Sequence, residues 1–183
     1  MGWYEIAKLV HFMALIALFG FFVIYARAGG ALRGAKTLSE ARTWLGMLEA
    51  TRGMLPGGAV MFLLSGITMA ALRWRGPYPF ITVGMVTLLV IWITWAFVGS
   101  RHLRAIRAAV GDSDGAISPT LARVILDPAR WGAIGALNGA ALGVLVVMTL
   151  KLDWLWSVVA VVLLATLVGT IFTANTRRQR DGR

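Results

Sequence analysis

Residues 3–27 read WYEIAKLVHFMALIALFGFFVIYAR, and this stretch decides the fold class of the chain. A helix that crosses a bilayer needs roughly 17–25 predominantly apolar residues, and this stretch meets that length. Three ionisable residues, Glu5, Lys8 and His11, stand in its first half. Such groups cost about 2.5–3.5 kcal/mol each at mid-membrane depth. We therefore expect that water still reaches these side chains or that they hold a partner.

The composition of the chain is typical of an integral membrane protein. Hydrophobic residues make up 58% of the 183 residues, and charged residues only 14%. Soluble domains contain about 45–50% apolar and about 25% charged residues. A cleaved signal peptide is not expected, because the first apolar stretch is too long and no basic segment precedes it. The absence of cysteine excludes disulfides, thiolate metal sites and haem attached through Cys-x-x-Cys-His.

Five stretches meet the length criterion and predict an all-α transmembrane helical bundle formed by one domain, residues 1–183. The predicted spans are residues 3–27, 54–73, 79–100, 129–150 and 154–174. Only Lys151, Leu152 and Asp153 separate the last two spans, which predicts a tight helical hairpin. The alternative is one long broken element, which leaves four spans.

The distribution of basic residues predicts the orientation in the membrane. Arginine and lysine concentrate in residues 27–52, in residues 101–130 and in the C-terminal tail. Because such segments stay in the cytoplasm, we expect a multi-pass protein of the cell inner membrane with the N-terminus outside. The C-terminus is then cytoplasmic, and the basic surface is expected to meet anionic lipid headgroups rather than nucleic acid. Four tryptophans then form an aromatic belt at the outer interface: Trp3, Trp74, Trp154 and Trp156.

The two basic segments contain helix signals. Thr37 and Glu40 have the spacing of a capping box, and apolar residues recur after them at helical intervals. We expect a short amphipathic helix there that lies on the inner membrane surface or docks against the bundle. In the second segment, Ser118 and Asp127 each precede a proline, which predicts two helix starts.

Span four carries a stripe of small residues. Gly135, Gly139 and Gly143 repeat every four residues on one face, so that another helix can approach closely. Asn138 lies in the same helix and needs a hydrogen-bond partner, because lipid offers none. The stripe predicts packing inside this bundle, with a homodimer seam or contact with a larger membrane complex as the alternatives.

The polar residues of the first span are the candidate binding residues. Tyr4, Lys8 and His11 fall on one narrow stripe of the helix, at 100° per residue. One interpretation pairs Glu5 with Lys8 at the interface and gives His11 a hydrogen bond to a neighbouring helix. The other makes His11 a metal ligand, most plausibly for haem iron, with Lys8 beside it.

The second histidine limits how haem could be held. His102 follows the third span among arginines, where we expect a solvated face that meets lipid headgroups. The two histidines differ in depth by about 20 Å or more, so one haem cannot bridge them within a monomer. Any haem therefore uses His11 alone, His11 with a thioether, or His11 from two subunits. The candidate thioethers are Met13, Met54, Met61, Met69 and Met85.

The start of the second span contains a pair of opposite charges. Glu49 and Arg52 are three residues apart, which predicts an ion pair. Pro56 and the two following glycines loosen the first turn, and Ser65 with Gly66 permits close helix approach. Ordinary membrane-helix packing accounts for all of these features.

Two of these stretches resemble a known family. WYEIAKLVHFMALIALFG resembles the first helix of the bacterial inner-membrane protoporphyrinogen oxidase, and LEATRGMLPGGAVMFLLSGI resembles its second helix. The pattern is shared with uncharacterised integral membrane families and with the membrane domain of D-type copper-resistance proteins. The resemblance covers about 70 residues. It implies a helical bundle with a haem b site at His11 and a functional lysine at Lys8.

The third span departs from the oxidase pattern. The oxidase has polar residues there, including lysine and histidine, whereas this span has only threonines and tryptophans before Arg101. Oxidation of protoporphyrinogen is therefore not expected, and a relative of the oxidase is the better match. We predict a haem-associated, redox-active membrane protein, or alternatively a non-catalytic subunit of a larger respiratory or photosynthetic complex. A small transporter or copper-handling protein ranks third, since no repeated half and no methionine cluster is present.

Overall fold

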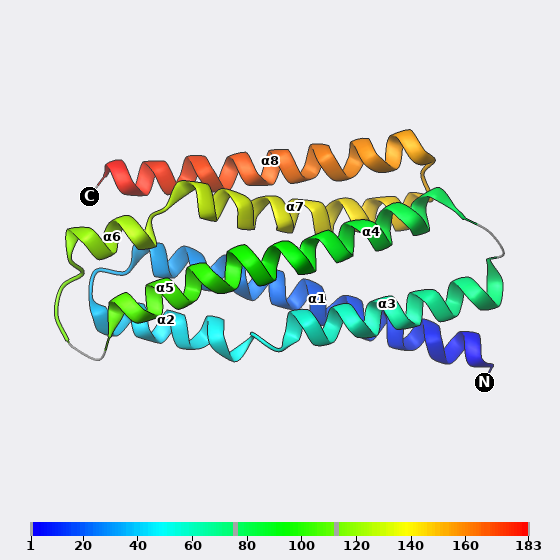
Figure 1. The fold of residues 1–183 in the computed structure, drawn as a ribbon, viewed down its shortest axis with the longest axis horizontal. Coiled ribbons are helices and arrows are strands. Elements are labelled where there is room, and N and C mark those ends of the chain that lie inside the picture. The colour runs from blue at the N-terminus through cyan, green and yellow to red at the C-terminus, as the bar shows by residue number, and fades with distance from the viewer. Residues whose placement is uncertain (1, 75–76, 112–113, 183) are drawn as a thin grey trace.

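The computed structural model describes residues 2–74, 77–111 and 114–182, and it is an elongated helical bundle (Figure 1). The predicted all-α transmembrane fold is confirmed. The helices in chain order are α1 (Trp3–Gly34), α2 (Leu38–Ala50), α3 (Met54–Arg73), α4 (Pro79–Thr94), the π-helix η1 (Trp95–Gly99), α5 (Ser100–Val110), α6 (Pro119–Ile125), α7 (Pro128–Leu150) and α8 (Trp154–Asp181).

Five helical stretches in the described part of the chain are long and apolar enough to cross a membrane. They are Trp3–Gly34, Leu38–Arg73, Pro79–Val110, Pro119–Leu150 and Trp154–Asp181. Many large apolar side chains face outward along these stretches, among them Ile16, Leu64 and Leu163. A soluble protein does not expose such a surface, whereas a bilayer covers it. The chain is therefore a multi-pass membrane protein.

The helix starts follow the signals in the sequence. Thr37 caps α2, and its side chain accepts a hydrogen bond from the Glu40 amide. Glu40 reaches back to the amide of Lys36, one residue before the predicted position. Ser118 caps α6 and Asp127 caps α7, each followed by proline in the first turn. These caps satisfy backbone donors that the helix itself leaves free.

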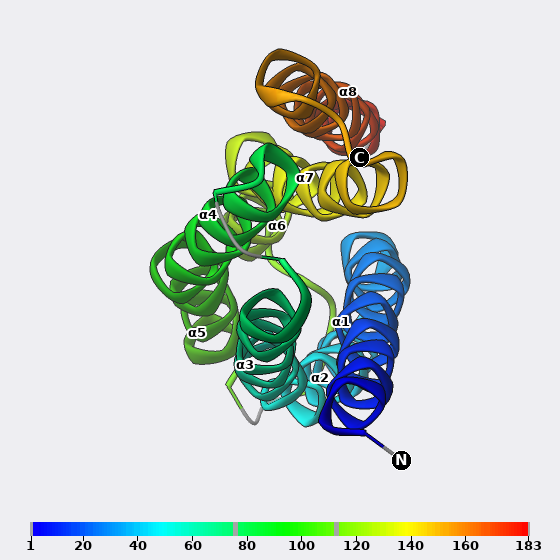
Figure 2. The same ribbon diagram turned by 90° about the vertical axis from the view of Figure 1, so that its right-hand side faces the viewer.

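The helices run nearly parallel to the long axis, and α8 lies at the outside of the bundle against α7 (Figure 2). Helix α1 packs against α3 and α2, and α4 packs against α7. Helix α2, together with α6 and the C-terminus, gathers at one end of the molecule, which we call the basic end (Figure 1). The N-terminus lies at the opposite end.

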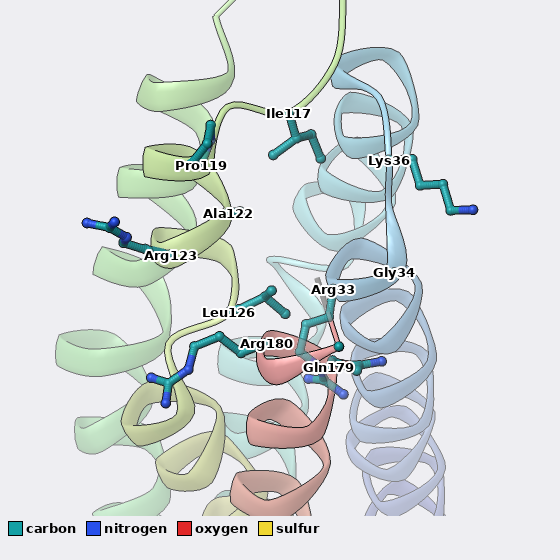
Figure 3. A pocket seen from close by; sticks show the side chains of 11 residues that line it. Arg33, Gly34, Lys36, Ile117, Pro119, Ala122, Arg123, Leu126, Gln179 and Arg180 are labelled. Atoms are coloured by element: carbon teal, nitrogen blue, oxygen red, sulfur yellow. Dashed lines mark hydrogen bonds between the residues drawn. The ribbon is translucent and has the colours of Figure 1, made fainter.

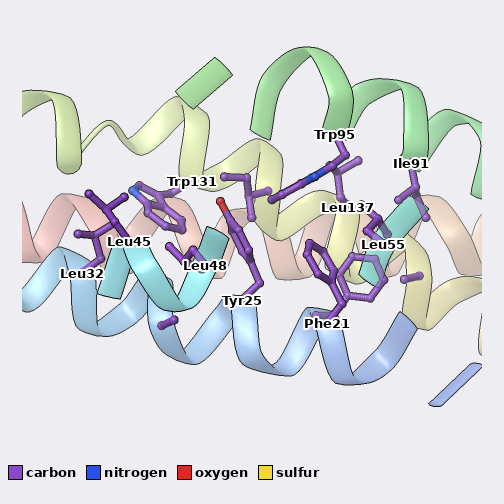
Figure 4. Packing of buried hydrophobic residues seen from close by; sticks show 14 of the residues in the cluster. Phe21, Tyr25, Leu32, Leu45, Leu48, Leu55, Ile91, Trp95, Trp131 and Leu137 are labelled. Atoms are coloured by element: carbon purple, nitrogen blue, oxygen red, sulfur yellow. The ribbon is translucent and has the colours of Figure 1, made fainter. Parts of the chain in front are cut away.

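Helix α2 docks on the bundle rather than lying apart from it. Its buried face consists of Ala41, Leu45 and Leu48, which join the main apolar core. That core continues through Phe21, Tyr25 and other large side chains of the neighbouring helices (Figure 4).

One turn of the third span is a π-helix, Trp95–Gly99. The Trp95 ring packs on Phe21 and Tyr25, with centroids 5.2 and 4.5 Å apart. The same ring lies against Gly99, where an added Cβ would stand 2.5 Å from the Trp95 Cε3 atom. Glycine is therefore required at position 99. Single π turns of this kind interrupt α-helices at the cost of one extra residue.

Candidate functional site

His11 lies on the face of α1 that meets α3. Its Nδ1 atom is 3.0 Å from the Ser65 hydroxyl oxygen. Its ring stacks on Phe62, with the two ring centroids 3.9 Å apart. Gly66 follows Ser65 and leaves room for the imidazole, since a Cβ there would be 3.4 Å from the His11 Cε1 atom. Three residues of α3, Phe62, Ser65 and Gly66, thus surround this ring.

The hydrogen bonds of Ser65 determine which nitrogen of His11 carries the proton. The Ser65 hydroxyl lies 2.6 Å from the Met61 carbonyl oxygen and 3.1 Å from that of Phe62. A hydroxyl has one proton to donate, and these carbonyls take it, so its oxygen accepts from His11. His11 therefore donates from Nδ1, and its Nε2 lone pair is available. Histidine ligands of metals are commonly oriented in this way by a partner at the other nitrogen.

His11 lines a partly open cavity of about 420 Å³ whose other lining residues come mainly from α1, α3, α4 and α7. The walls are apolar and include Leu15, Phe62 and Val144. A volume between about 300 and 1,000 Å³ with apolar walls and few polar groups is typical of small-molecule and cofactor sites. A smaller cavity of about 100 Å³ adjoins it and also contacts His11.

The cavity brings two thioethers and two lysines to the same site as His11. Met69 of α3 and Met148 of α7 line both the larger and the smaller cavity. Lys8 of α1 and Lys151 of the α7–α8 turn line the larger cavity. The Lys151 ammonium lies 5.0 Å from the centroid of the Trp74 ring. Apolar walls with cations thus suit an apolar ligand that carries anionic groups.

Of the five methionines that the sequence offered as thioether ligands, only Met69 lines the larger cavity. Met85 lines only the smaller cavity. Met13 and Met61 are exposed on the outer surface of their helices. Met54 approaches Gly20 instead.

The structure shows no ion pair between Glu5 and Lys8, whose side chains it describes. The ion pairs among the described residues are Arg42–Asp114, Arg107–Glu49, Arg130–Asp127 and Arg180–Asp181.

Sequence reasoning missed three contributors to the site. Ser65 was expected only to allow close helix approach, and neither Met148 nor Lys151 was expected near His11. Ser65 could have been found from its position in the second span, because a hydroxyl in an apolar helix is a ready partner for a buried imidazole. Met148 and Lys151 approach only through tertiary packing, which no local signal contains.

The environment of His102 corrects the sequence-based expectation of a solvated, lipid-facing residue. Its side chain is 0% exposed, and its ring meets the edge of Trp131 with centroids 5.6 Å apart. Arg130 donates to its Nδ1 atom over 3.3 Å. His102 shares the inward face of α5 with Ile106 and Val110, at intervals of four residues, while its arginine neighbours point elsewhere.

The glycine stripe of α7 faces α8. An added Cβ at Gly135 would lie 2.7 Å from Phe172 Cβ, and one at Gly143 would lie 2.6 Å from Val161 Cα. At Gly139 it would overlap the backbone of Leu164. The stripe thus serves packing inside the bundle. Asn138 satisfies its amide locally, by donating to the carbonyl oxygen of Ile134 in the same helix over 2.9 Å.

Glu49 pairs with Arg107 of α5 at 3.2 Å, which corrects the expected pair with Arg52. Helix α2 ends at Ala50, so Arg52 lies in a turn and does not occupy the helical position three residues along. The backbone amide of Arg52 donates to the Glu49 carbonyl oxygen over 3.0 Å. Side chains three apart face each other only within a continuous helix.

The described residues contain no group of three or more His, Cys, Asp or Glu side chains arranged to hold a metal ion. The site is built instead around one imidazole in an apolar cavity. No family model matches the chain, and no curated protein or solved structure does either.

Proposed function

We propose that the chain binds haem b through His11 in the bacterial inner membrane and works in a redox context. The observation that carries the proposal is the 3.0 Å contact between His11 Nδ1 and the Ser65 hydroxyl, which fixes the imidazole at the wall of an apolar cavity of about 420 Å³. With Nδ1 as the donor in this contact, the Nε2 lone pair is left for a ligand. Histidine is a usual axial ligand of haem iron, and the polarity of the surrounding pocket tunes the iron. Bound haem would supply one-electron transfer between the ferric and ferrous states.

The residues of the cavity have separate roles in this proposal. If haem is bound, His11 would hold its iron, and Met69 or Met148 would offer a thioether from the same cavity. Lys8 and Lys151 would offer cations for the carboxylates of haem. The remaining lining is mostly apolar. Outside the cavity, the membrane part of the chain is poor in acids, bases and nucleophiles, so any chemistry is carried by a cofactor.

Visible absorption spectra test the proposal. Wild-type protein, H11A and H102Q are purified in mild detergent from haem-replete cells, and spectra are recorded oxidised and dithionite-reduced. We expect a Soret band that shifts on reduction in wild type and H102Q and is absent from H11A. Elution volume and thermal unfolding, compared with those of wild type, are used to check that H11A is folded. A full Soret band in folded H11A, or a featureless wild-type spectrum, would contradict haem ligation at His11.

The same proposal includes an orientation with the N-terminus outside and the C-terminus in the cytoplasm. The basic residues of α2, α5 and the tail support it, since they gather at one end of the bundle. Because the chain has no cysteine, single cysteines at Gly2 and Gly182 give a direct test. A membrane-impermeant maleimide should label G2C but not G182C in intact cells; the reverse pattern would overturn the orientation.

The second candidate function is a non-catalytic subunit of a larger respiratory or photosynthetic membrane complex. The exposed apolar side of α8 favours it, since only 11% of the apolar window of α8 is buried and α8 packs chiefly on α7. Blue native electrophoresis of gently solubilised membranes tests this function. Migration of the chain with a larger complex, combined with a featureless spectrum, would favour it over haem binding.

A further inference from the structure

A second cavity, of about 840 Å³, lies at the basic end of the bundle. The His11 site lies nearer the opposite end, which carries the N-terminus. The C-terminal end of α1, helix α6 with its preceding loop, and the C-terminal end of α8 line the second cavity, and it is open to one side (Figure 3). These three segments are distant in sequence and meet only in the fold. The cavity is independent of the proposed haem site.

Four basic residues line this cavity, and no acidic residue lines it in the described part of the chain: Arg33, Lys36, Arg123 and Arg180. The wall between them is apolar and includes Ile117, Pro119 and Leu126 (Figure 3). Cations beside an apolar wall match a ligand that has an anionic group attached to hydrocarbon. Basic pockets between helices at the cytoplasmic side of membrane proteins recognise phosphate-bearing headgroups.

Arg33 forms a preorganised part of the cavity. Its side chain is 7% exposed, and its guanidinium lies 4.3 Å from the centroid of the Trp131 ring. Its Nε atom donates to the Gln179 amide oxygen over 3.1 Å. The stacked ring and the amide hold the guanidinium in place at the wall of the cavity. A planar guanidinium fixed in this way suits a phosphate oxygen pair.

The other three cations are long and solvent-accessible. Lys36 and Arg123 stand on opposite flanks of the cavity with their side chains extended outward (Figure 3). Arg180 lies 3.6 Å from the carboxylate of its neighbour Asp181, and both side chains are exposed. Exposed ion pairs of this kind contribute little, so a phosphate can compete for Arg180.

We propose that this cavity binds the phosphate group of an anionic ligand, and the apolar wall favours a phospholipid headgroup as its source. The cavity lies at the C-terminal ends of α1 and α8, beyond the predicted spans 3–27 and 154–174, and the polar region next to a span is where headgroups lie. Its volume lies within the range of about 300–1,000 Å³ that is typical of ligand sites.

The test compares lipid binding by two double variants that remove the same charge. R123Q/R180Q neutralises two cavity cations, and the control R177Q/R178Q neutralises two arginines of α8 that do not line the cavity. Purified protein is titrated with dioleoyl phosphatidylglycerol or dioleoyl phosphatidylcholine, and bound lipid is counted by native mass spectrometry. An arginine that donates directly to a phosphate in the cavity is worth about fivefold in affinity, whereas an arginine outside the cavity makes no such contact with the bound lipid.

We expect phosphatidylglycerol to bind wild type and the control with similar affinity, and R123Q/R180Q about 25-fold more weakly. Equal weakening in both double variants would overturn the proposal, because it would show diffuse surface attraction. Equal binding of phosphatidylcholine and phosphatidylglycerol to wild type would also overturn it. Thermal unfolding of each variant shows that the substitutions leave the bundle folded.

A further arm distinguishes the two sources of phosphate. Inorganic phosphate is added at millimolar concentration to protein in neutral detergent at constant ionic strength, and the melting temperature is recorded. A rise in wild type that is lost in R123Q/R180Q, without selective binding of phosphatidylglycerol, assigns the site to a soluble phosphate compound. Selective lipid binding without such a rise assigns it to a headgroup. Neither effect in wild type would refute the site.

Discussion

The two histidines of this chain occupy opposite environments in the two halves of one bundle. In what we call the open half, His11 is half-buried and lines a cavity of about 420 Å³. In what we call the sealed half, His102 is fully buried and its ring meets the edge of Trp131, which packs in turn on Tyr25 (Figure 4). The name refers to this packed interior and excludes the cavity of about 840 Å³ on the far side of Arg33. The difference teaches that packing, rather than position along a span, decides whether a polar side chain is accessible to a ligand.

The largest expected difference between the two halves is in the free energy of unfolding that is lost when a tryptophan is replaced by alanine. Trp131 is 0% exposed, and its indole donates to the Ile125 carbonyl oxygen over 2.7 Å. Trp131→Ala should lower the free energy of unfolding by about 3–5 kcal/mol. Trp74 lines the open cavity and is only half-buried, so Trp74→Ala should cost less than about 2 kcal/mol. Reversible unfolding in mixed micelles measures the two losses of unfolding free energy. Equal losses would contradict the difference in packing between the two halves.

Two glycines give the next test. A Cβ at Gly29 would stand 2.5 Å from the ring of Trp131, which is fully buried, so Gly29→Ala should cost about 1–3 kcal/mol. A Cβ at Gly66 would stand 3.4 Å from the His11 ring, beside the cavity. Gly66→Ala should change stability by no more than about 0.5 kcal/mol. The melting temperatures of the two variants measure the difference. An unchanged melting temperature in Gly29→Ala would show that the Trp131 ring can shift to accommodate a methyl group.

Ser65→Ala sharpens the account of the open half. It removes the acceptor of the His11 Nδ1–H and should cost about 0.5–1.5 kcal/mol. Thr68→Ala is the control, because its hydroxyl lies on the same helix and bonds only to the Leu64 carbonyl oxygen. Ring nitrogen chemical shifts in ¹⁵N-histidine-labelled protein should show the Nδ1–H tautomer of His11 in wild type and Thr68→Ala. An unchanged tautomer in Ser65→Ala would refute the role of Ser65.

The smallest effect concerns the surface of the sealed half. A double-mutant cycle of Glu49→Gln and Arg107→Gln should give a coupling energy below about 1 kcal/mol, because the pair is half-exposed. The matched cycle with Arg52→Gln should give no coupling. Thermal unfolding at low and high salt measures both cycles. Coupling only in the Arg52 cycle would restore the pairing expected from the sequence.

The sequence was sufficient to predict the membrane helices and several of their starts. Runs of apolar residues have a required length in a bilayer, and capping residues such as Asp127 act on the backbone beside them. These are local signals, so they survive without knowledge of the tertiary structure. The first helix nevertheless continues to Gly34, beyond the predicted end at residue 27, because Arg27 is tolerated where the helix leaves the apolar region.

The site was less predictable than the fold. His11 could be singled out because an ionisable group in an apolar helix needs a reason. Its partner Ser65 and the cavity residue Met148 come from other helices, and their approach depends on packing across the bundle. His102 was misjudged because its sequence neighbours are arginines, although those neighbours point to other faces of α5.

The π turn at Trp95–Gly99 has a consequence for the angular phase of the third span. A π turn holds one more residue than an α turn, so it sets how the residues after it are rotated relative to those before it. Deleting Ala96 would restore regular winding and rotate α5 by about 100° around its axis. His102 would then leave Trp131 and swing toward the outside of the bundle. The burial of His102 thus depends on the one extra residue of the π turn, which precedes it by more than a full helical turn.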